Sequence, residues 1–204
     1  MAQAGAAIGR EFDYVLLVAI SDLPEQQSWE ALDRLTAAGL VFARGAPPEA
    51  SYLFKHALVQ DVAYGSMLRG RRQSLHRRIA ATLEEQFPEV VQAQPALLAQ
   101  HCQDAGLAEK AVGYWLKAGQ QALARSAMAE AEAQLRKGLK ILATLPDSSW
   151  RRQQELDLQV TLTWAMSGAK GISARAFRRR RWERRSRERA SWPKTSINRS
   201  TSCR

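Results

Sequence analysis

The side chains of this sequence that could do acid–base or metal chemistry are few and widely spaced. Its histidines are His56, His76 and His101, and its cysteines are Cys102 and Cys203. His101 adjoins Cys102, but neighbouring residues on a helix point in different directions, so we do not expect a Cys–His dyad. His76 lies among arginines, and we expect it to face solvent. The two cysteines are too few and too far apart to indicate a disulfide framework or a zinc site.

Sequence motifs of the common catalytic classes are missing. The sequence contains no G-x-x-x-x-G-K-[ST] loop, no G-x-G-x-x-G, no H-E-x-x-H and no G-x-S-x-G. The Asp and Glu residues are scattered along the chain rather than grouped. We therefore expect a chain without catalytic residues, and without a cofactor or metal of its own.

The positive charge of the chain is concentrated at one end. The formal net charge is +10, but residues 170–204 hold 13 Lys+Arg and 2 Asp+Glu, and the first 169 residues hold 17 basic and 18 acidic side chains. The near-neutral body does not suggest nucleic acid or an anionic membrane as a partner. Apolar runs are shorter than the ~18–20 residues that span a bilayer, and no secretory signal pattern is present, so we expect a cytoplasmic protein.

Residues 1–88 have the pattern of short helices interrupted by one hairpin. Segments 40–43 and 51–54 have strand composition and flank a Pro-rich loop, and helices are predicted over 57–68 and 71–87. This order is close to that of a winged-helix domain, whose first helix would come from residues 2–8.

The helix before the hairpin has its own start and stop signals. Asp22 is a candidate N-cap, and Gly39 is a good left-handed terminator. The spacing of Trp29, Leu32 and Leu35 directs all three toward a core.

Residues 92–167 are predicted to be helical throughout and to form an incomplete repeat array. Trp115, Ala118, Gly119 and Ala122 follow the tetratricopeptide pattern, as do Ala131, Leu135 and Gly138. In that pattern small residues lie where two helices of a hairpin touch, and large ones fill the gap between hairpins. The pattern supports one repeat, and a second can be threaded only in a conflicting register. Fewer than three repeats rarely stand alone, so the array looks truncated.

The sequence contains two charged surfaces that could bind a partner. The helix before the hairpin would read DNA in a winged-helix domain, but it carries Glu25, Glu30 and Asp33 against Arg34 alone. A net acidic surface is poorly suited to phosphates, so we expect no specific nucleic acid. The second surface is a basic cluster that could contact phosphate or an acidic partner, or could be a solvated helix face: Arg69, Arg71, Arg72, Arg77 and Arg78.

The segment 168–204 is predicted to be a disordered basic tail. Apolar periodicity stops after Gly168, and the run Phe177-Arg178-Arg179-Arg180-Arg181-Trp182 is a charge block. The Arg-, Ser- and Trp-rich composition of the tail resembles the translation of a GC-rich gene in a shifted reading frame.

Several segments together resemble one family of large bacterial signalling proteins. These segments are Ile8-Gly9-Arg10-Glu11-Phe12, the stretch 54–68 (FKHALVQDVAYGSML), 75–86 (LHRRIAATLEEQ) and 108–127 (AEKAVGYWLKAGQQALARSA). The family joins a class III adenylate/guanylate cyclase domain, or a transcriptional output domain, to a STAND-type AAA ATPase and then to tetratricopeptide repeats. The resemblance covers residues 1 to about 171 and corresponds to the region from just after the ATPase core into the first repeats.

The resemblance implies a nucleotide-sensing role for one histidine. In STAND ATPases the winged helix packs on the nucleotide domain and helps to hold the ADP-bound state, and a Met-His-Asp motif places its histidine near the ADP phosphates. His56 corresponds to that histidine, although Ala57 stands where the motif has Asp. An imidazole can donate a hydrogen bond to a phosphate oxygen. His56 could also be a plain hinge or core residue.

The sequence therefore predicts a mainly α protein, with a winged-helix-like domain over 1–88 and tetratricopeptide-like hairpins over 92–167. Its predicted function is non-catalytic: a regulatory or scaffold segment of a signalling ATPase. The partners implied are the ATPase domain and a protein or small-molecule ligand on the repeats, with ATP or ADP and Mg²⁺ bound by the parent protein only. The alternative is a stand-alone winged-helix transcriptional regulator that binds nucleic acid.

Overall fold

The computed structural model describes residues 1–168, which are mainly helical and carry one small sheet. The elements follow one another as α1 (Ala2–Ile8), β1 (Glu11–Asp13), α2 (Tyr14–Ile20), α3 (Glu25–Ala37), β2 (Val41–Arg44), β3 (Ser51–Phe54), α4 (Ala57–Gly65), α5 (Arg69–Gln86), α6 (Pro88–Ala93), α7 (Pro95–Asp104), α8 (Ala108–Ala124) and α9 (Met128–Leu142). A further helix covers 149–168. The tail predicted over 168–204 lies outside the described residues, apart from Gly168.

The sheet closes the core of the N-terminal part. Its strand order is β1-β3-β2 with both pairings antiparallel, and Phe12 of β1 pairs with Tyr52 of β3. The rings of these two residues stack with centroids 5.8 Å apart, and Phe54 tilts against Phe12 at 5.6 Å. These aromatic side chains are buried with Leu17, Leu32 and Val41 in one cluster. The predicted hairpin is confirmed, and β1 is an additional strand that the sequence pattern did not reveal.

Helix α3 departs from two predictions about its ends and its buried face. The Asp22 side chain does not cap it, because Pro24 occupies the N-cap position and Asp22 instead pairs with Arg78 of α5. Trp29 is 49% exposed, so the prediction that it points to the core is wrong, whereas Leu32 is fully buried. The helix lies against β2 and buries Ser28 and Leu32, and Trp29 lies outside this buried face. Gly39 ends the helix with a φ of +68°, as predicted.

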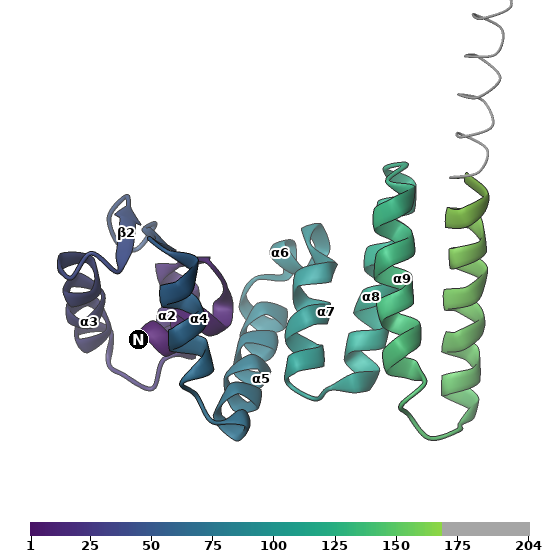
Figure 1. The fold of residues 1–204 in the computed structure, drawn as a ribbon, viewed down its shortest axis with the longest axis horizontal. Helices are drawn as coiled ribbons and strands as arrows, with labels where there is room; N and C mark the ends of the chain where they lie inside the picture. The colour runs from purple at the N-terminus through teal and green to yellow at the C-terminus, as the bar shows by residue number, and fades with distance from the viewer. Residues whose placement is uncertain (169–204) are drawn as a thin grey trace, which may run out of the picture.

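The C-terminal part is a row of antiparallel helices. Figure 1 shows α7, α8, α9 and the helix 149–168 standing side by side along the long axis of the molecule, with α3 at the opposite end. Helix α8 packs against both α7 and α9. A Cβ atom added to Gly119 would lie 2.5 Å from Cγ of Leu135, so the close approach of α8 and α9 requires a glycine at this position.

A single apolar cluster joins the two parts of the chain. It includes Leu16 of α2, Leu75 and Ile79 of α5, Leu98 of α7 and Trp115 of α8. The predicted limit between the two segments, at 88–92, falls on α6, whose Val91 also belongs to this cluster. The buried surface is therefore continuous from the N-terminal helices into the hairpins.

The close contact at Gly119 leads to a matched pair of substitutions within α8. Gly119→Ala is expected to lower the free energy of unfolding by about 1–3 kcal/mol, because the new methyl group overlaps Leu135 in a packed core. Gly113→Ala, on the exposed face of the same helix, meets no atom within 4 Å and is expected to raise it by about 0.5–1 kcal/mol. Urea denaturation of the two variants measures both effects. If Gly119→Ala raised the free energy of unfolding and Gly113→Ala lowered it, α9 would not lie against Gly119.

Candidate functional site

His56 lies at the start of α4, beside an exposed apolar surface. It is the N-cap residue of that helix, with an extended backbone, and its carbonyl oxygen accepts a hydrogen bond from the Val59 amide at 3.1 Å. The imidazole itself makes no capping hydrogen bond and is exposed. On the helix that follows, Leu58 is 75% exposed and Val62 70% exposed. Figure 1 shows α4 in front of α2, facing the viewer.

The five arginines of the predicted basic cluster are spread around α5. Arg78 pairs with Asp22, and Arg77 donates a hydrogen bond to the carbonyl oxygen of Ala105 at 3.4 Å. The Arg72 guanidinium lies over the Tyr64 ring, 5.3 Å from its centroid. Arg69 and Arg71 are exposed. Three of the five side chains therefore contact other parts of the chain.

The structure brings His76 and His101 together in the seam between α5 and α7. The prediction that His76 faces solvent is wrong, because it is 4% exposed and lies on the same face of α5 as Ile79 and Ala80. His101 is 3% exposed. The two Nδ1 atoms are 3.0 Å apart, which is hydrogen-bond distance, and the ring centroids are 5.2 Å apart.

Polar groups from α4 and α7 extend this contact. The Tyr64 hydroxyl lies 2.9 Å from Nε2 of His76, and a carboxylate oxygen of Asp104 lies 4.0 Å from the same nitrogen. Nε2 of His101 is buried and has no hydrogen-bond partner within residues 1–168. A groove of about 310 Å³ passes beside these side chains between α1, α4 and α7.

Burial sets the ionisation of both histidines. It lowers the pKa of His76 below its ordinary value; Asp104 opposes this shift and Arg72 reinforces it. Burial, with the neighbouring His76, lowers the pKa of His101 to about 4, against a smaller opposing effect of Asp104. The adjacent Cys102 is fully buried, and burial raises the pKa of its thiol to about 11, so it is a poor nucleophile.

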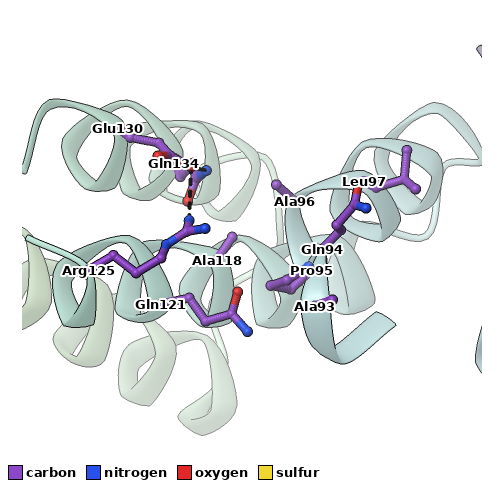
Figure 2. A pocket seen from close by; sticks show the side chains of 10 residues that line it. All are labelled: Ala93, Gln94, Pro95, Ala96, Leu97, Ala118, Gln121, Arg125, Glu130 and Gln134. Carbon is purple, nitrogen blue, oxygen red and sulfur yellow. Dashed lines mark hydrogen bonds and ion pairs between the residues drawn. The ribbon is translucent and has the colours of Figure 1, made fainter. Parts of the chain in front are cut away.

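A second groove lies between the hairpins and is shown in Figure 2. It measures about 200 Å³ and is formed by Ala93–Leu97 on one side and by Ala118, Gln121, Arg125, Glu130 and Gln134 on the other. Arg125 reaches from the end of α8 across to Glu130 of α9, with 3.3 Å between the charged atoms. Gln134 donates a hydrogen bond to the same carboxylate at 2.9 Å.

Gln134 is the most unusual side chain of this second groove. It is only 9% exposed, and its Oε1 atom is buried without a partner among the described residues. A buried carbonyl oxygen without a hydrogen bond is destabilising by about 1–3 kcal/mol. Such a group is rare in native structures, where most buried polar atoms have a hydrogen-bond partner.

The described residues contain neither a candidate metal centre nor a helix that could cross a membrane. In residues 1–168, no group of three or more His, Cys, Asp or Glu side chains is placed to hold a metal ion. None of the helices in that range is long and apolar enough to cross a bilayer.

Comparison with known proteins identifies an uncharacterized bacterial relative. No family model matches the sequence, and no solved structure matches it. An uncharacterized protein of Rhizobium meliloti (strain 1021) is 30% identical over 180 residues, which is 88% of this chain. The chain spans only 18% of the length of that relative.

The unpartnered oxygen of Gln134 leads to a stability prediction. Gln134→Met keeps the volume and the helix propensity of the side chain and removes the buried acceptor, at the cost of one hydrogen bond to Glu130. We expect the free energy of unfolding to stay unchanged or to rise by up to about 1 kcal/mol. Gln120→Met, on the exposed face of α8, is the control and should change it by less than about 0.5 kcal/mol. A loss well above 1 kcal/mol for Gln134→Met alone would contradict the assignment of Oε1 as unsatisfied.

Proposed function

We propose that this chain is a non-catalytic regulatory segment of a multidomain bacterial signalling ATPase. In this proposal the N-terminal part is a winged helix that packs on the nucleotide-binding domain, and the hairpins are tetratricopeptide-like and bind a partner. Binding on the hairpins then changes the stability of that packing and so shifts the nucleotide switch. The protein acts by contact between domains and carries no bond chemistry of its own.

The observation that carries the proposal is the exposed apolar surface beside His56. Leu58, Val62 and Leu68 are exposed by 75%, 70% and 83%, and the first two lie one turn apart on α4. Leu and Val side chains left in water at this density are typical of a surface that another domain covers. His56 stands at the edge of the surface, where the family resemblance expects a histidine that reports on ADP.

The order of the elements supports the winged-helix assignment. A helix, a short strand, two helices and a hairpin follow one another, and the sheet has the order β1-β3-β2. The helix that would enter DNA is α3, which carries Glu25, Glu30 and Asp33 and one arginine, Arg34. Its acidic surface favours a protein contact over a nucleic-acid contact.

The packing of the hairpins supports the tetratricopeptide assignment. Gly119 allows α8 and α9 to approach, and Gly138 allows α9 to approach the helix 149–168, where a Cβ would lie 3.0 Å from Leu158. Large side chains such as Trp115 and Leu135 fill the spaces between helices. The groove with Gln134 and Arg125 then lies between successive helices, where it is open to a partner. The match to a much longer bacterial protein is compatible with a segment that works inside a multidomain chain.

The proposal is tested with the nucleotide-binding domain of the parent protein, which is identified by sequencing the genomic DNA on both sides of this segment. Val62→Asp is expected to weaken the binding of residues 1–168 to that domain by about 10-fold or more, because a carboxylate would be buried in an apolar contact. The binding is measured by calorimetry in the presence of ADP. The isolated chain is expected to hydrolyse no ATP and to make no cyclic nucleotide.

Phe42→Asp is the matched control for this measurement. Phe42 is also exposed and apolar, at 51%, but it lies on β2 and outside the proposed contact. It should leave the affinity within about 2-fold, since exposed substitutions away from a contact change it little. Equal losses for the two variants, or the absence of a P-loop in the neighbouring reading frame, would refute the proposal.

A further inference from the structure

The strongest feature that the proposed function leaves unused is a buried line of polar side chains across three helices. It runs from the Tyr64 hydroxyl on α4, through His76 on α5, to His101 on α7, with contact distances of 2.9 Å and 3.0 Å. On one side it adjoins the apolar cluster that holds Leu75, Ile79 and Leu98, and on the other it lines the groove of about 310 Å³. Polar groups in such a setting must be paired, because an unpaired one is costly in a medium of low polarity.

The neutral pair can make its contact in two ways. A neutral imidazole carries one N–H, so one Nδ1 must donate and the other must accept. If His76 donates, its Nε2 is bare and accepts from the Tyr64 hydroxyl, and His101 carries its proton on the unpartnered Nε2. If His101 donates, His76 carries its proton on Nε2, which then faces Tyr64 and Asp104. The hydrogen bond between α5 and α7 exists in both arrangements.

One added proton leaves this bond intact, and a second one removes it. The first proton, taken from solvent, can reside on Nε2 of His76, which faces the Tyr64 oxygen and the Asp104 carboxylate. His76 then still donates from Nδ1 to Nδ1 of His101. The second proton can bind only to Nδ1 of His101. Two N–H groups and two positive charges would then face each other between Nδ1 atoms that are 3.0 Å apart in the structure.

The charged groups around the pair do not neutralise a second proton. Helix α5 presents the Arg72 guanidinium, which is positive, and α7 presents the single carboxylate of Asp104. Helix α4 contributes Tyr64, and its Asp61 lines the adjoining groove. Helix α1, which forms another wall of that groove, has no ionisable side chain. Asp104 is the carboxylate that acts on both histidines, and it can balance one proton.

We propose that the His76–His101 contact is a proton-sensitive latch that holds α5 against α7 and releases them when both histidines are protonated. This inference goes beyond the proposed function, since the latch belongs to this chain alone and requires no ATPase domain. Its effect would be to loosen the packing of α5 against α7 at low pH, within the apolar cluster that joins the two parts of the chain.

The direction of the pH effect follows from the lowered pKa values. A histidine whose pKa is lower in the folded protein than in the unfolded chain stabilises the fold fully above the unfolded pKa of 6.5, and this stabilisation is lost as the pH falls toward the folded pKa, which is about 4 for His101. From His101 alone, the unfolding equilibrium constant is expected to rise about 20-fold between pH 7 and pH 5. His76 adds to the rise, because its pKa is also lowered.

The experiment compares the full chain with two variants by urea denaturation at pH 7 and pH 5. His101→Gln keeps a side chain that can hydrogen-bond to His76 but cannot take up a proton, so the increase in the unfolding constant should shrink by about 20-fold. His56→Gln removes the exposed histidine and should reproduce the wild-type increase. Hydrogen exchange, corrected for intrinsic rates, should show faster exchange in α5 and α7 at pH 5 and unchanged exchange in α9.

Two results would overturn the latch. One is a pH dependence of His101→Gln equal to that of the wild type; the other is an acceleration of exchange that is uniform over all helices. If His101→Gln fails to fold at pH 7, NMR titration of the wild-type histidine rings decides instead. A ring of His101 that titrates at about 4 supports the latch, and one that titrates at 6.5 or above refutes it.

Discussion

The structure depends on the burial of one face of α5. Leu75, Ile79 and Leu83 of this face are each exposed by 8% or less, and each contributes about 1.5–3 kcal/mol through removal from water. The helix packs against α1 and α2 on one side and against α7 on the other, so it is the element that both parts of the chain share. The histidine pair lies in this seam, with its two Nδ1 atoms 3.0 Å apart.

The hairpins depend on a different constraint, which is the presence of glycine at two contacts between helices. Gly119 and Gly138 let α8, α9 and the helix 149–168 approach more closely than larger residues would allow. Helix α8 contacts α7 and α9, and Gly138 of α9 lies close to Leu158. The helices stand in a row in Figure 1, so the stability of each helix depends on its neighbours. A partner bound between two helices would therefore act on α7, and through α7 on α5.

The helices and the hairpin could be predicted from the sequence because apolar spacing and Gly or Pro residues mark them. Strand β1 could not, since three residues give no period. Trp29 and Asp22 were predicted wrongly because local spacing cannot show which neighbours cover a helix. The burial of His76 had a signal, namely its place three and four residues before Ile79 and Ala80, but the flanking arginines outweighed it. Its pairing with His101 depends on tertiary packing and was beyond local patterns.

The continuous core has a consequence for how such proteins can be recombined. A gene fusion that joined these N-terminal helices to a foreign hairpin array would leave α5 facing an unrelated surface in place of Leu98 and Trp115. The exchange would succeed only if the new first hairpin matched both the apolar shape of the seam and a polar partner for His76. The N-terminal helices and the first hairpin are therefore expected to be inherited together.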